Sequence, residues 1–253
     1  MWPSGGVLWV EVRLPYRRDV RPGQFVQVWV PCAGCRVFTQ LALLYVVVAE
    51  REKTTRESTI RMVARPQRGL IDILYRSSFT RPRPVAILGP YGRPHNFAPY
   101  GTIVFAVEDI GIFRALSYIG MLVEDSRKRQ VMARKVEIVW QRDKAFENPE
   151  WFKIWRQELM DLDYNSFELQ TEAINQARLP RKIGERILVY NRSVDFTEEI
   201  SRCLDEQCGE MAVAVCAGSH ARECVKKAVQ LHPYKRAQIV ELDMGPYHTW
   251  PST

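Results

Sequence analysis

One stretch near the middle of the chain, residues 86–112, separates two regions with different hydrophobic patterns. It holds a strand that ends in Gly89-Pro90-Tyr91-Gly92, a connector rich in Pro, Asn and Gly, and a second apolar strand over Thr102–Val107. Before this stretch, apolar residues alternate with period two, as in short antiparallel strands. After it, apolar strands alternate with helical segments. The sequence therefore predicts two domains of different class, 1–98 and 99–253.

The first region has the pattern of a small antiparallel β-barrel. The expected elements are strands over Val7–Leu14, Phe25–Val30, Phe38–Glu50, Thr59–Ala64 and Pro84–Leu88, and a short helix over Gly69–Arg76. Arg21-Pro22-Gly23-Gln24 supplies a turn between the first two strands. About five antiparallel strands with one helix predict a small closed barrel.

The second region has the pattern of an α/β doubly wound domain with a parallel sheet. The expected strands are Thr102–Val107, Lys135–Gln141, Phe167–Thr171, Ile187–Tyr190, Met211–Cys216 and Gln238–Leu242. The expected helices are Phe113–Glu124, a segment from Glu150 to Leu162, Asp195–Gln207 and His220–Leu231, the last capped by Ser219. Apolar strands that alternate with helices indicate a parallel sheet covered on both faces.

Composition excludes several classes of function. Residues 1–98 carry 15 Lys and Arg against 6 Asp and Glu, but the basic residues are almost all Arg, are spread singly and form no nucleic-acid motif. No nucleic-acid partner is therefore expected. The longest apolar run, residues 38–49, is too short to span a membrane. No secretory signal is readable, so the expected location is the cytoplasm.

The cysteines and histidines predict no metal site. Cys32 and Cys35 have C-x-x-C spacing but lie in a turn between strands, and Cys203 and Cys208 do not give the second pair that a zinc site needs. The four histidines are scattered without the spacing of metal ligands. Free, reduced thiols are the expectation in the cytoplasm.

Five short motifs in order give the chain a resemblance to the ferredoxin reductase superfamily, in particular to the cytosolic part of fungal ferric reductases and NADPH oxidases. The motifs are Arg21–Phe25, Arg36–Thr39, Gly89–Gly92, Ile110–Ile112 and Lys135–Trp140. The resemblance implies that the barrel binds FAD, that the second domain binds NAD(P)H, and that hydride passes from nicotinamide to flavin. It covers nearly the whole chain and includes no membrane haem domain, so a soluble activity is expected.

The resemblance implies a flavin site in the first domain. Arg36 would pair with a flavin phosphate, Phe38 would pack on the isoalloxazine, and Thr39 would face its N5 atom. These residue types suit those roles, because a guanidinium fork matches phosphate and a flat apolar ring matches a flavin. Gly89 and Tyr91 are further candidates for cofactor contacts. An ordinary alternating strand with one exposed Arg explains Arg36 equally well.

The family's first phosphate-binding segment is altered in this chain. Gly69-Leu70-Ile71-Asp72 stands where the family has Gly-x-Ser/Thr, so Gly69 is kept, the hydroxyl is lost and a carboxylate is gained. Asp72 is expected to act as a helix N-cap, which would keep the helix while weakening its affinity for anions.

The family's second phosphate-binding segment is altered as well. The family has Ala-Gly-Gly-x-Gly-Ile-Thr where this chain has Val107–Phe113, so Glu108 and Asp109 replace glycines and Gly111 remains. Two unit charges about 4 Å apart repel by about 4 kcal/mol at the effective dielectric of a protein surface. Binding of NAD(P)H in the usual mode is therefore not expected.

Two further residues carry alternatives. Cys216 lies where the family often has a Cys near the nicotinamide, which makes it a catalytic candidate; a buried, inert thiol at a strand end explains it as well. Trp250 lies where relatives often place an aromatic ring against the flavin, and a surface anchor is the other interpretation.

Three functions remain compatible with the sequence. The first is a soluble FAD-dependent oxidoreductase of the ferric-reductase type, acting on a small-molecule substrate or electron acceptor in a fungal specialised-metabolite pathway. The second is a degenerate reductase fold that acts as a cofactor-free isomerase or cyclase on an apolar metabolite. The third is a non-catalytic binding module that pairs with a reductase partner. Fold analogy alone does not decide among them.

Overall fold

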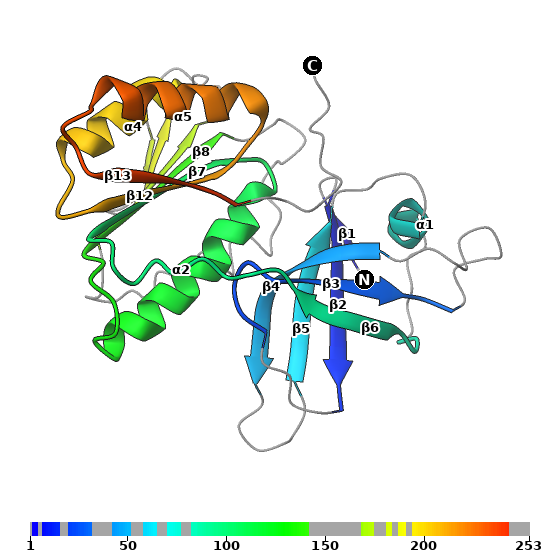
Figure 1. Cartoon of the computed structure of the whole chain (residues 1–253). Coiled ribbons are helices and arrows are strands. Elements are labelled where there is room, and N and C mark those ends of the chain that lie inside the picture. The colour runs from blue at the N-terminus through cyan, green and yellow to red at the C-terminus, as the bar shows by residue number, and fades with distance from the viewer. Residues whose placement is uncertain are drawn as a thin grey trace. The chain divides into compact units, whose positions relative to one another are not determined.

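The computed structural model describes residues 2–4, 7–15, 20–31, 42–51, 58–64, 70–76, 82–141, 168–174, 181–183, 187–190 and 194–242. The chain divides into two compact units, Met1–Pro94 and His95–Thr253. The first contains an antiparallel sheet and the second an α/β sheet (Figure 1), so the expected two-part architecture is confirmed. No helix within these described ranges is long and apolar enough to cross a membrane.

The first unit is built on a six-stranded antiparallel sheet with the order β1-β2-β5-β4-β3-β6. Its elements are β1 (Trp2–Ser4), β2 (Val7–Leu14), β3 (Phe25–Trp29), β4 (Ala42–Arg51), β5 (Ser58–Ala64), α1 (Leu70–Arg76) and β6 (Ala86–Tyr91). Apolar side chains at alternate positions point into one core, as Val26 and Val28 of β3 do. Leu74 brings α1 onto the same core.

Strand β6 and Asp72 differ from the sequence-based expectation. Strand β6 extends beyond Leu88 to Tyr91, because Tyr91 pairs in register with Phe25 of β3. Asp72 is not the N-cap of α1 but lies inside its first turn, where its Oδ1 accepts a hydrogen bond from Arg76 Nε at 2.9 Å. This carboxylate therefore supports the helix through an i,i+4 ion pair rather than through its first N–H groups.

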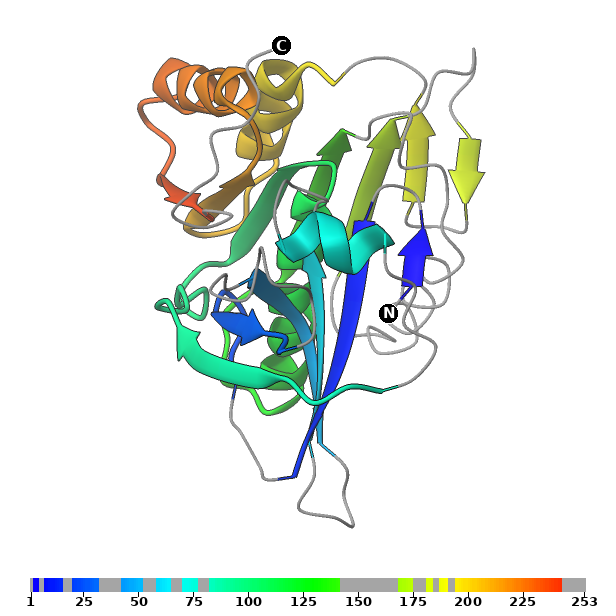
Figure 2. The same ribbon diagram turned by 90° about the vertical axis from the view of Figure 1, so that its right-hand side faces the viewer.

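The second unit is built on a seven-stranded sheet with the order β10-β11-β9-β8-β7-β12-β13. Its strands are β7 (Thr102–Glu108), β8 (Lys135–Gln141), β9 (Glu168–Ile174), β10 (Arg181–Ile183), β11 (Ile187–Tyr190), β12 (Met211–Cys216) and β13 (Ala237–Glu241). Every neighbouring pair is parallel except β10 with β11. Figure 2 shows strands of this sheet side by side.

Helices cover both faces of this sheet. Helix α2 (Gly111–Arg127) lies on one face, and α4 (Phe196–Asp205) and α5 (Ser219–Leu231) lie together on the other (Figure 1). Strands β7, β8 and β12 are buried along almost their whole length, as expected for parallel strands between two helical layers. Helix α2 buries Ile112, Leu116 and Ile119, which share one face at helical spacing.

The two helices on the second face begin in different ways. The N-cap of α4 is Asp195, whose carboxylate accepts from the N–H groups of Thr197 and Glu198 at 2.9 and 3.2 Å. The sequence predicts Ser219 as the N-cap of α5, but in the structure Ser219 is the first residue of the helix. The N-cap is Gly218, and no side chain of this segment caps the helix.

The order of strands reverses between β7 and β12. From β7 the chain adds β8, β9 and β11 on one side, and β12 and β13 then take the other side. Val107 near the end of β7 therefore pairs in register with Cys216 at the end of β12. In open α/β sheets, ligands bind outside the carboxyl ends of the strands at such a reversal. This carboxyl edge is the first place to look for a functional site.

Candidate functional site

Glu108 connects β7 to the start of α5. Its Oε2 accepts a hydrogen bond from the main-chain N–H of Gly218 at 2.6 Å. Because Gly218 is the N-cap of α5, the carboxylate lies at the positive end of that helix dipole. Glu108 thus supplies from another strand the anionic cap that the local sequence of α5 lacks.

Asp109 adopts a backbone conformation that glycine adopts most readily. Its φ angle is 46°, in the left-handed region that Asp adopts more readily than most residues. Its N–H donates to the carbonyl of Gln141 at 2.9 Å, and its own carbonyl accepts from Trp140 Nε1 at 3.0 Å. The turn after β7 is therefore fixed to the end of β8 by main-chain geometry.

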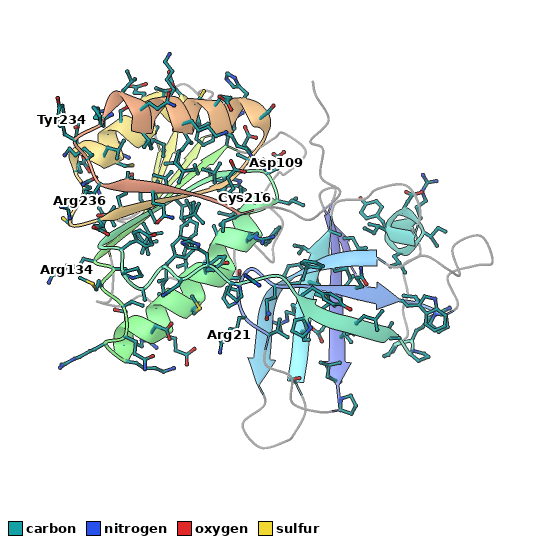
Figure 3. All side chains as sticks on the ribbon, in the orientation of Figure 1. Arg21, Asp109, Arg134, Cys216, Tyr234 and Arg236 are labelled. Carbon is teal, nitrogen blue, oxygen red and sulfur yellow. The ribbon has the colours of Figure 1, made fainter. Side chains whose placement is uncertain are left out.

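Gly111 and Cys216 meet at the same edge. A β carbon at position 111 would lie 2.4 Å from the carbonyl oxygen of Cys216 and 3.2 Å from its sulfur. Such a distance is too short for any side chain, so a glycine is needed where α2 begins against β12. Cys216 is completely buried, and Figure 3 shows it beside Asp109 at this end of the sheet.

Main-chain N–H groups at the N-terminus of α2 also donate hydrogen bonds within the protein. Its N-cap, Ile110, makes no side-chain capping bond. The N–H groups of Ile112 and Phe113 donate to the carbonyls of Asp109 and Ile110 at 3.4 and 3.1 Å. Helix N-termini attract phosphate groups through free N–H donors and the helix dipole. Here these donors, like that of Gly218, bind oxygens of the chain itself.

In the first unit, two motifs far apart in the sequence lie side by side. The turn before β3 is closed by the N–H of Arg21, which donates to Gln24 Oε1 at 2.8 Å. Gln24 Nε2 then donates to the carbonyl of Gly92 at 3.4 Å. The rings of Phe25 and Tyr91 lie 5.7 Å apart. The turn at residues 21–25 and the segment 89–92 therefore form one surface of this unit.

Gly89 fixes the position of the Tyr91 ring on that surface. Its φ angle is +113°, and a β carbon there would lie 2.9 Å from the Tyr91 ring. Tyr91 is 42% exposed, so part of this aromatic residue is accessible to solvent. An aromatic ring suits a planar conjugated ligand.

The other predicted flavin residues, Arg36, Phe38, Thr39 and Gly69, lie outside the described residues, as does Trp250. Their roles stay predictions. Sequence reasoning missed Gly218 and Trp140, which hold Glu108 and Asp109 in place. The reversal of strand order would have indicated Gly218, but it depends on pairing between strands that are more than 100 residues apart.

Comparison with solved structures identifies this fold in flavoproteins. A ferredoxin NADP+ reductase from Neisseria gonorrhoeae with bound FAD and NADP has a TM-score of 0.59 and 14% identity, over 95% of this chain and 94% of that one. The cytochrome b5 reductase domain of Ulva prolifera nitrate reductase has a TM-score of 0.57 and 9% identity, over 94% and 92%.

A third similar structure is the flavohem-like FAD/NAD-binding domain of a nitric oxide dioxygenase from Vibrio cholerae. Its TM-score is 0.53 at 11% identity, over 95% of this chain and 94% of that one. No protein-family model matches the sequence, and no curated protein matches it significantly. At these identities the similarity establishes the ferredoxin-reductase-type fold.

Proposed function

We propose that this protein is a flavin-dependent oxidoreductase of the ferric-reductase type, with FAD bound by the first unit. The observation that carries the proposal is the surface on which the turn at residues 21–25 meets the segment Gly89–Gly92. It combines an accessible aromatic ring, Tyr91, with the fold of proteins whose structures contain FAD. Arg36, Phe38 and Thr39 would complete the site, and the bound flavin would supply the redox chemistry.

A visible absorbance spectrum of the purified protein tests this proposal. The protein is incubated with FAD, desalted and examined for the absorption bands of oxidised flavin. Arg36→Ala is expected to weaken FAD binding by at least about tenfold, because a guanidinium–phosphate pair contributes a strong charge-assisted bond. Arg13→Ala, which removes an exposed Arg from β2, is the matched control and should not change it. Equal retention of FAD by both variants would refute the assignment of Arg36.

A second candidate function is favoured by the hydrogen bond between Glu108 and Gly218. In this candidate, the Glu108 carboxylate occupies the carboxyl edge of the sheet in place of a nucleotide. The protein then has no redox chemistry and is a cofactor-free isomerase or cyclase, or a binding module. The same spectrum separates the two candidates. A protein that stays colourless after incubation with FAD would rule out the flavin enzyme and leave the second candidate.

A further inference from the structure

The fold implies NAD(P)H as a second cofactor, but the residues at the carboxyl edge do not fit it. Three main-chain donors at this edge, the N–H groups of Ile112, Phe113 and Gly218, bind oxygens of the protein. Gly111 is packed against β12, because a β carbon there would lie 2.4 Å from the carbonyl oxygen of Cys216. The start of α5, which would attract phosphate, is already bound by the carboxylate of Glu108.

We propose that Glu108 determines this exclusion: its carboxylate acts as an internal anion that takes the place of a nucleotide phosphate at the start of α5. Glu108 is partly buried and its Oε2 lies 2.6 Å from the Gly218 nitrogen. A short bond to a charged acceptor is the strong kind of hydrogen bond. An incoming phosphate would have to displace this carboxylate and then remain beside its negative charge.

Asp109 has a different role in this arrangement, although the sequence presents the two acids as a pair. Its position is set by its main chain, through the carbonyl of Gln141 and the indole of Trp140. The left-handed φ angle of 46° would suit glycine at least as well. Replacing Asp109 by Gly therefore preserves the turn and leaves Glu108 on Gly218.

The test is isothermal titration of NADPH into the wild type and three variants. Wild type is expected to bind with a Kd weaker than about 1 mM. Glu108→Gln removes the charge and keeps an acceptor for Gly218, and Glu108→Ala also frees the N–H group. Both variants are expected to bind NADPH at least about tenfold more tightly than wild type. Asp109→Gly is expected to change the affinity less than about threefold.

The control is Glu210→Gln, which removes one exposed carboxylate from the opposite end of β12, where Glu210 pairs with Arg236 at 3.4 Å. It should not raise the affinity for NADPH. Tight binding by wild type, no gain in either Glu108 variant, or an equal gain in Asp109→Gly would each overturn the proposal. A gain in Glu108→Ala without one in Glu108→Gln would show that volume, not charge, excludes the nucleotide. If Glu108→Ala does not fold, Glu108→Gln carries the test.

The proposed role of Glu108 concerns the carboxyl edge of the sheet in the second unit and does not depend on the flavin site of the first unit. FAD retention is measured on the same samples. A wild type that binds FAD and a Glu108→Gln variant that does not gain affinity for NADPH would refute only the role of Glu108. A wild type without FAD would refute only the proposed flavin function.

Discussion

The two ends of the parallel sheet in the second unit neutralise their acidic side chains in different ways. At the carboxyl end, Glu108 and Asp195 accept hydrogen bonds from main-chain N–H groups at the starts of α5 and α4. At the amino end, Glu137 on β8 is fully buried and is paired with Arg202 and with Lys135, whose Nζ lies 3.4 Å away. Acids thus serve as helix caps at one end and as ion-pair partners at the other.

The difference predicts unequal costs of substitution. A cap that is at least partly exposed, as Glu108 and Asp195 are, can be replaced by solvent, whereas water does not replace the partner of a buried ion. Substitutions of acids at the amino end are therefore expected to lower the free energy of unfolding more than substitutions at the carboxyl end. Figure 3 shows this separation, with Asp109 and Cys216 at one end and Arg134 and Arg236 at the other.

The largest effect is expected from Glu137→Gln. The substitution keeps the shape but removes the fully buried charge that faces Lys135 and Arg202, so the free energy of unfolding should fall by about 3 kcal/mol, although these two residues keep their ion pairs with Glu206 and Glu199. Urea denaturation monitored by circular dichroism measures the change. Glu124→Gln, which breaks the exposed pair with Lys128, is the control and should cost less than about 0.5 kcal/mol. Similar values for the two variants would contradict a structural role for the amino end.

The second effect concerns the close contact at the carboxyl end. Gly111→Ala would place a β carbon 2.4 Å from the Cys216 carbonyl, and overpacking of this kind costs about 1–3 kcal/mol. Gly120 lies in the same helix with open space around it, so Gly120→Ala should instead stabilise the protein by about 0.5–1 kcal/mol. Thermal unfolding of the two variants measures this. A shift in the same direction for both would show that α2 does not press on β12 as described.

Most of the fold could be read from the sequence because the signals are local. Alternating apolar residues gave β2 (Val7–Leu14) as the structure has it, and apolar runs gave β8 and β12 with their observed bounds. Two short strands, β1 (Trp2–Ser4) and β10 (Arg181–Ile183), were not expected. Three residues are too few to show a period, and their pairing with β2 and β11 supplies what the sequence cannot show.

The candidate site was less readable because its contacts are not local. The motif at residues 107–113 predicts a nucleotide site in which Glu108 and Asp109 are equivalent acids. Only the pairing of β7 with β12 brings Glu108 to Gly218, 110 residues away in sequence. For the same reason the local sequence predicts Ser219 as the cap of α5, although the N-cap is Gly218. The predicted helix over Asp195–Gln207 begins within one residue of α4, whose N-cap is Asp195.

The third effect compares these two caps. Asp195→Ala should lower the free energy of unfolding by about 1 kcal/mol, because two N–H groups of α4 lose their acceptor. Glu108→Ala should cost a similar amount at α5, since a cap acts through its carboxylate wherever the residue lies in the sequence. Chemical denaturation of both variants tests this equivalence. No loss in Glu108→Ala would mean that its bond to Gly218 contributes nothing to the helix.

The smallest effect is a pH dependence at the amino end. The hydrogen bond from Lys135 lowers the pKa of Glu206 below its ordinary value of 4.5. Burial lowers the pKa of Lys135, but its hydrogen bond to Glu206 and the charges of Glu206 and Glu137 outweigh this effect, so the Lys135 pKa is raised.

A lowered carboxyl pKa stabilises the folded state above the unfolded pKa, and this stabilisation is lost as pH falls through the folded one. A raised lysine pKa adds stability that is lost only when pH rises through the folded value.

Because the Glu206 side chain is 49% exposed, Glu206→Gln should cost less than about 1 kcal/mol at neutral pH. The difference from wild type should shrink as pH falls from about 6 to about 3 and should also shrink at high salt. A difference that stays constant over this range would show that the Lys135–Glu206 bond does not act through charge. The amino end would then depend on the ion pairs of the buried acids Glu137 and Glu199, and its contrast with the main-chain caps of the carboxyl end would become sharper.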